Sequence, residues 1–153
     1  MRPVASTYAR TRANPDAGSA TLEFLAVGVL LLVPLAYLVL TLGRVQAATF
    51  AAESGAREAA RVLATTDGDE LARERAEAVV TIALADQGFT PAPGSLDLEC
   101  AATPCRTPQA SVAASVRVAV DLPLVPGFVR GAVPVSVPVQ VRRVAVADRF
   151  AAP

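Results

Sequence analysis

The sequence has no histidine, no tryptophan and no lysine among its 153 residues, and it has only two cysteines. Histidine is the commonest general base, the commonest metal ligand and the usual partner of a serine or cysteine nucleophile. Its absence argues against an enzyme and leaves only carboxylate chemistry open. The 14 basic residues, all arginine, balance 14 acidic residues. We therefore expect no catalytic residues, no cofactor, no metal site and no nucleic-acid partner.

What the sequence does have is one long apolar segment. Hydrophobic residues make up 53 % of the chain, and an uncharged run of 19 residues extends from Phe24 to Leu42. As an α-helix this run would span about 28 Å, close to the hydrocarbon thickness of a bilayer. Few soluble helices are apolar on every side. We therefore predict a transmembrane helix in contact with membrane lipid, with a kink at Pro34 that a membrane helix tolerates.

The residues before the apolar run carry more positive charge than those after it. Arg2, Arg10 and Arg12 precede the run, whereas only Arg44 follows it closely. Positive charge tends to remain on the cytoplasmic side of a membrane. The sequence thus predicts a single-pass membrane protein, with its N-terminus in the cytoplasm and its C-terminal region extracytoplasmic.

Beyond the membrane the pattern first remains helical. An alanine-rich stretch continues the first helix to Ala64, and Glu53 and Arg57 have the i,i+4 spacing that supports a helix. A second helix is expected over residues 70–87, with a capping box formed by Asp67 and Glu70. Gly88 follows it as a helix-ending glycine.

The remaining sequence alternates as β-strands do. Strands are expected at residues 96–100, 112–120 and 133–141, and prolines confine the last one to a sheet edge. Val144 and Val146 are out of phase with it, which predicts a bulge at Arg142-Arg143, whose side chains would end the strand in solvent. The expected fold is α+β, with a long N-terminal transmembrane helix, a second helix and a small antiparallel sheet. Its parts are a leader (1–18), the membrane helix with its extension (19–64) and an extracytoplasmic region (65–153).

A glycine and a glutamate border the apolar run in a distinctive way. Gly18 is followed by four residues and then by Glu23, at the mouth of the membrane segment. A carboxylate there is costly unless it is paired. A cut between Gly18 and Ser19 would give Ser19 a new ammonium group and would make Glu23 the fifth residue of the mature chain.

This junction resembles the processing site of type IV pilins, which a prepilin peptidase cleaves. Within that superfamily the chain is most similar to TadE-like proteins, in Ala20-Thr21-Leu22-Glu23-Phe24, in Pro34 and in the segment Gly55–Arg61. The resemblance implies a pilin-like fold and a minor pilin or pseudopilin that assembles a tight-adherence pilus or a related secretion apparatus. Glu23 and Phe24 would act in assembly, with Glu23 attracting the N-terminal ammonium of a neighbouring subunit.

The resemblance also implies partners, which are the prepilin peptidase, other pilins and minor pilins, and the inner-membrane pilus assembly platform. Two alternatives remain open. One is an uncleaved, membrane-anchored binding or sensor module with an extracytoplasmic domain. The other is a secreted enzyme whose helix is a removed signal, which the lack of histidine and of an A-x-A-like site after the apolar run disfavours.

The two cysteines are Cys100 and Cys105. Two thiols alone cannot build a zinc site, and their spacing is not that of a redox C-x-x-C motif. In an extracytoplasmic region a disulfide is expected. The alternative is a pair of reduced, partly buried thiols.

Overall fold

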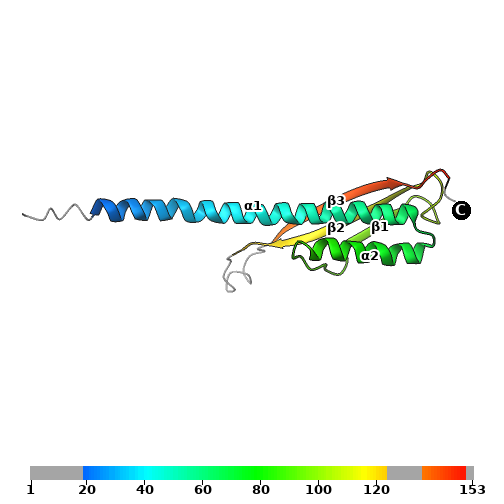
Figure 1. Ribbon diagram of the computed structural model, residues 1–153, viewed down its shortest axis with the longest axis horizontal. Helices are drawn as coiled ribbons and strands as arrows, with labels where there is room; N and C mark the ends of the chain where they lie inside the picture. Colours follow the sequence, from blue (N-terminus) through cyan, green and yellow to red (C-terminus); the bar gives the residue numbers. More distant parts are fainter. Residues whose placement is uncertain (1–18, 124–135, 151–153) are drawn as a thin grey trace, which may run out of the picture. The chain divides into compact units, whose positions relative to one another are not determined.

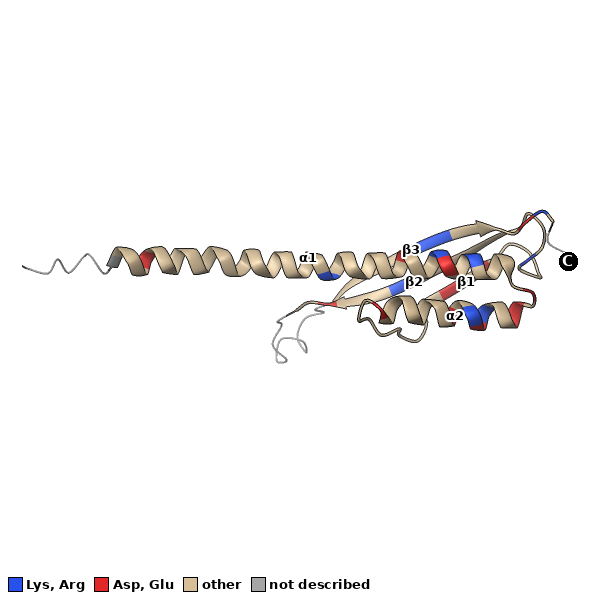
Figure 2. Ribbon diagram, in the orientation of Figure 1, with Lys and Arg blue, Asp and Glu red and all other residues tan. Residues whose placement is uncertain are grey.

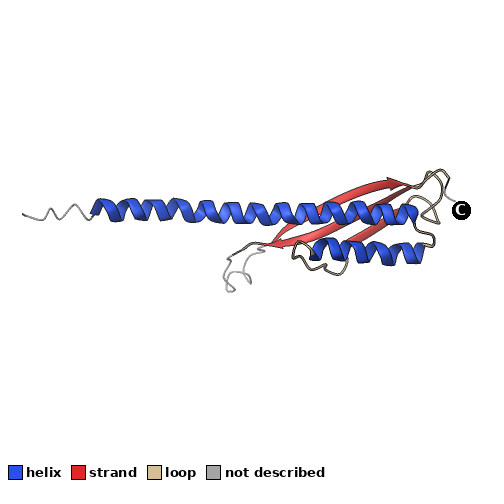
Figure 3. Cartoon of the chain, viewed as in Figure 1, coloured by secondary structure: helices blue, strands red, loops and turns tan. Residues whose placement is uncertain are grey.

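The computed structural model describes residues 19–123 and 136–150. The chain divides after Leu38 into two units, the first part of a long helix and a folded unit that holds everything from Val39 onward. The predicted α+β fold is confirmed (Figures 1 and 3). Along the chain the elements are α1 (Ser19–Thr65), α2 (Asp69–Ala85), β1 (Leu96–Cys100), β2 (Ser111–Asp121) and β3 (Ser136–Val146).

The first part of α1 has no protein cover. Its leucine, valine and phenylalanine side chains from Leu22 to Leu42 are all between 49 and 76 % exposed. No charged residue lies between Glu23 and Arg44, which leaves this stretch without a red or blue segment in Figure 2. Exposing so much apolar surface to water is unfavourable by about 25 cal/mol per Å². Among the described residues α1 is the helix that is long and apolar enough to cross a membrane, and it fits a single-pass anchor.

Beyond Arg44 one face of α1 becomes buried, and that face consists of small side chains. Alanine is the best helix former and lets neighbouring elements approach closely. At Gly55 an added Cβ would lie 3.5 Å from Val80 Cα and 3.5 Å from Ala83 Cβ, so the α1 and α2 backbones come close together there. The alanines of this face that are at most 2 % exposed are Ala48, Ala51, Ala52, Ala56, Ala59 and Ala60.

α2 packs against the core along one apolar stripe. Val79 and Ala83 are half-buried beside it. The helix ends at Ala85, two residues earlier than predicted, and Gly88 follows with a φ of 72°. Phe89 N–H donates to the Leu84 carbonyl at 2.9 Å, which closes the end of the helix. The fully buried members of the stripe are Ala72, Ala76, Val80 and Leu84.

The capping box predicted for the start of α2 is wrong. Gly68 occupies the N-cap position with a φ of 86°, and no side chain caps the helix there. Asp67 instead forms an ion pair with Arg106, far away in the sequence. Asp69 and Glu70 lie in the first turn, where their negative charges interact favourably with the helix dipole.

The sheet is antiparallel, with β2 between β1 and β3. The inner face of β2 carries the alternating apolar residues predicted from the sequence, and they meet the core side of α1 and α2 in one cluster. Leu63 of α1 and Leu84 of α2 are among the largest buried side chains of that cluster. The β2 residues in it are Val112, Ala114, Val116, Val118 and Val120.

Within the described residues β3 is an edge strand, as its prolines predicted. Arg117 N–H donates to the Ser95 carbonyl at 2.7 Å on the β1 side, so Ala119, two residues on, also directs its backbone groups to that side. Pro138 is paired with Ala119, and its nitrogen therefore faces away from β2, where no ladder bond is lost. The predicted strand residues 133–135 lie outside the described residues.

The predicted bulge in β3 is wrong. β2 and β3 keep one register over all 11 pairs. Arg143 takes an inward position where an apolar residue was expected, so Val144 and Val146 face outward and are 62 and 63 % exposed. An arginine can occupy the inner face because its guanidinium reaches the Glu53 carboxylate of α1.

Candidate processing and assembly segment

The predicted processing site falls at the start of α1. Ser19 is the first helical residue, and Gly18 lies outside the described residues. Glu23 follows four residues later, so both residues lie on the same face of the helix. The Glu23 side chain is exposed, and no ion pair involves it within residues 19–123 and 136–150. Among the described residues its carboxylate therefore has no ion-pair partner.

The residues after Glu23 continue the bare apolar surface. Phe24 is 76 % exposed, so its ring is available to lipid or to a neighbouring helix. α1 extends through Pro34 as one helix, which agrees with the tolerance of membrane helices for proline. The kink at Pro34 stays a prediction.

Arg44, the first charged residue after the apolar run, belongs to the folded unit. Its guanidinium carbon lies 5.0 Å from the centroid of the Phe89 ring, and Phe89 is 8 % exposed. A cation over an aromatic face is attracted by the ring quadrupole, by about 0.5–1 kcal/mol at exposed sites. The loop after α2 is thus held against α1 directly beyond its apolar part.

A charged cluster joins α1 to β3, and the sequence predicts only part of it. Glu53 accepts a hydrogen bond from Arg57 at 3.0 Å, the expected i,i+4 pair, and another from Arg143. The pKa of Glu53 is held below its ordinary value of 4.5 mainly by Arg143 and to a smaller extent by Arg57. The prediction that Arg142 and Arg143 end the strand in solvent is wrong, because β3 continues to Val146.

The alternation of side chains along β3 could have indicated the Glu53–Arg143 pair, because it places Arg143 at an inward position. An arginine at an inward position needs an acidic partner, but the partner is 90 residues away in the sequence. On the outer face Arg142 donates to Glu99 at 2.6 Å. Glu99 is on β1 and Arg142 on β3, so this pair bridges the outer face of the central strand.

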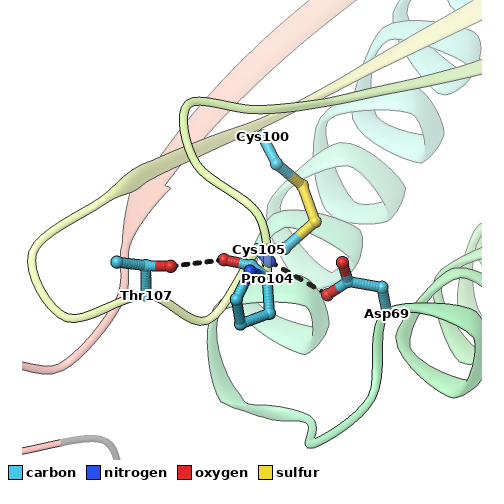
Figure 4. Close-up of a disulfide and its surroundings, with 5 residues drawn as sticks. All are labelled: Asp69, Cys100, Pro104, Cys105 and Thr107. Atoms are coloured by element: carbon cyan, nitrogen blue, oxygen red, sulfur yellow. Dashed lines mark hydrogen bonds between the residues drawn. A yellow bond between two sulfur atoms is a disulfide. The ribbon is translucent and has the colours of Figure 1, made fainter. Parts of the chain in front are cut away.

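The two cysteines form a disulfide at the end of β1 (Figure 4). The sulfur atoms of Cys100 and Cys105 are 1.98 Å apart. Cys105 N–H donates to Asp69 Oδ1 at 2.9 Å, and Arg106 forms an ion pair with Asp67. The loop that the disulfide closes is therefore fastened to the turn between α1 and the start of α2.

The ion pairs of the folded unit are spread over separate surfaces. They lie between α1 and β3, across the sheet, and between the α1–α2 turn and the disulfide loop. The part of the chain that the structure describes contains no group of three or more side chains suited to a metal ion. These three contacts hold elements of the folded unit together.

No family model, no curated protein and no solved structure matches this chain. The resemblance to TadE-like proteins therefore stays a prediction from the residues around Glu23, from Pro34 and from the segment Gly55–Arg61.

Proposed function

We propose that this chain is a minor pilin or pseudopilin of the TadE-like type, and that it acts in assembling a tight-adherence pilus or a related secretion apparatus. The observation that carries the proposal is a single helix with two kinds of surface. It exposes the Glu23 carboxylate and a bare apolar surface, and then supplies the buried alanine face of an α+β unit. Such a helix supports both membrane anchoring and display of the folded unit outside.

In this proposal a prepilin peptidase cuts between Gly18 and Ser19 on the cytoplasmic face of the plasma membrane. The new Ser19 ammonium then pairs with Glu23 of a neighbouring pilin. Opposite charges attract far more strongly in the low-dielectric membrane than in water, so the pair both removes the cost of the isolated carboxylate and selects a partner. The chain itself is a substrate and a structural component, with no catalytic role.

The mass of the membrane-extracted protein tests the processing step. We expect a mature chain that begins at Ser19, and we expect Gly18→Leu to leave the precursor intact. Gly28→Leu is the matched control, because it changes a nearby glycine of α1 with no neighbouring atom within 4 Å, and it should be processed normally. A chain that retains Met1 would contradict the proposal and favour the uncleaved binding or sensor module.

The assembly step is tested separately at Glu23. A Glu23→Ala chain should be processed and should reach the membrane, but it should not co-purify with the other pilins and the assembly platform. Glu23→Asp keeps the charge and should retain part of the association. Normal assembly of Glu23→Ala would remove the proposed role of this carboxylate.

A further inference from the structure

α1 carries an open hollow, bordered on one side by Glu53, whose carboxylate is also contacted by Arg143 of β3. The hollow is lined by Phe50, Glu53, Ser54, Arg57 and Glu58. Four of these residues stand at positions i, i+3, i+4 and i+7 of one helix. Four residues of one helix surround an inserted side chain of a facing helix in the same way in knobs-into-holes packing. Ser54 has the smallest side chain of the four, and it is exposed.

The same face also carries a side chain that could fill a hole. Phe50 is 68 % exposed, and it is the one large apolar side chain that α1 exposes between Arg44 and Thr65. The centre of the hollow lies between Glu53 and Ser54, three to four residues beyond Phe50. At the rise of an α-helix this is an offset of about 5 Å along the axis.

We propose that this face binds the same face of a second copy of the chain, with Phe50 of one copy seated in the hollow around Ser54 of the other. The inference rests on the proposed function, because copies anchored in one membrane by the same end present parallel α1 helices. Two parallel helices shifted by about 5 Å place the phenylalanine over the hollow. The inserted side chain, Phe50, and the hollow around Ser54 are then both supplied by the same chain.

The charges on the rim of the hollow agree with this shift. An offset of four residues brings Glu53 of the seated copy level with Arg57 of the copy that receives it, so the Glu53–Arg57 pair that each copy already contains continues across the contact. An unshifted parallel pair would instead place Phe50 against Phe50 and Glu53 against Glu53. Charge and shape thus favour the same staggered arrangement.

Site-directed disulfide cross-linking in the membrane tests the contact. Two differently tagged full-length copies are co-expressed, one carrying Phe50→Cys and the other Ser54→Cys. The chain's own cysteines are both held in the Cys100–Cys105 disulfide and do not compete. Mild oxidation should give a mixed dimer several-fold more efficiently for this pair than for Phe50→Cys with Ile82→Cys. Ile82 is an exposed apolar residue of α2, 59 % exposed, and serves as the matched control position.

A second measurement uses side-chain truncation. Phe50→Ala should reduce self-association in detergent or in membranes, whereas Ile82→Ala should leave it unchanged. Both side chains are exposed, so neither variant should unfold the protein. Equal cross-linking at positions 54 and 82, or cross-linking of position 50 only to a different protein, would overturn the second copy as partner. If the mature chain begins at Ser19 and its assembly depends on Glu23, such a result contradicts only the contact between two copies. A chain that retains Met1 would instead contradict the proposed function.

Discussion

Replacing Gly55 by alanine should stabilise the folded unit, although this glycine lies where α1 and α2 meet. The new Cβ would lie 3.5 Å from Val80 Cα, Val80 Cγ2 and Ala83 Cβ, which is ordinary van der Waals contact. Glycine inside a helix costs about 0.5–1 kcal/mol relative to alanine, and burial of one more carbon adds roughly 0.8 kcal/mol. The expected gain is about 1–2 kcal/mol, and each kcal/mol raises the thermal midpoint by roughly 4–6 °C in a unit of this size.

A larger side chain at the same position should have the opposite effect. Gly55→Val adds two further methyl groups between the α1 and α2 backbones, and overpacking of this kind costs about 1–3 kcal/mol. Gly43→Val is the matched control, because it lies in the same helix with no neighbouring atom within 4 Å. Thermal unfolding of the full-length chain in detergent, followed by circular dichroism, measures all three variants. A lower midpoint for Gly55→Ala, or equal midpoints for the two valine variants, would refute the described approach of the helices.

Three further outcomes are expected from the same unfolding assay. Replacing both Cys100 and Cys105 by serine should lower stability by about 2 kcal/mol, the chain-entropy value for so short a loop, and reduction of the native chain should have the same effect. Glu53→Gln should destabilise the protein at neutral pH. Because the pKa of Glu53 is lowered in the folded state, its contribution to stability is fully present above the ordinary pKa of 4.5 and is lost as the pH falls through the folded value. The difference in stability between Glu53→Gln and the native chain should therefore vanish in acid. A difference that persists there would contradict the ion pair. Val144→Ser should change stability by less than about 0.5 kcal/mol, because Val144 faces outward. Val116→Ser, at a fully buried position, should cost more than about 1 kcal/mol. Comparable losses for the two variants would contradict the continuous register of β2 and β3.

The elements of this fold could be predicted because their patterns are local. The apolar run is long enough to cross a bilayer as a helix, the alanine-rich extension and the stripe on α2 repeat with helical spacing, and the valines of β2 alternate with a period of two. The bounds of β1 agree with the predicted residues 96–100. Where the side chains of one element decide its structure, the sequence was sufficient.

The errors arose where a distant residue changed the meaning of a local pattern. Arg143 broke the apolar alternation, and a bulge was the simplest local explanation, but Glu53 of α1 gives the arginine a partner on the inner face. Asp67 has capping-box spacing, but Arg106 takes its carboxylate, and the cap position falls to Gly68. No local pattern reveals a partner that the fold supplies from 90 residues away. The hollow beside Phe50 was missed for a related reason, since it depends on which face of α1 the folded unit covers.

The polar contacts fix the elements in one position relative to each other, which the apolar core alone does not do. The covered face of α1 is mostly alanine and the inner face of β2 mostly valine, and two such uniform surfaces could slide past each other by a turn with little loss of buried area. Directional contacts restrict that sliding, as single polar residues do in coiled coils. They occur at three points along α1 and the turn that follows it, where Arg44 meets Phe89, Glu53 meets Arg143 and Asp67 meets Arg106. These three contacts therefore fix where α1 and its turn meet the loop after α2, β3 and the disulfide loop.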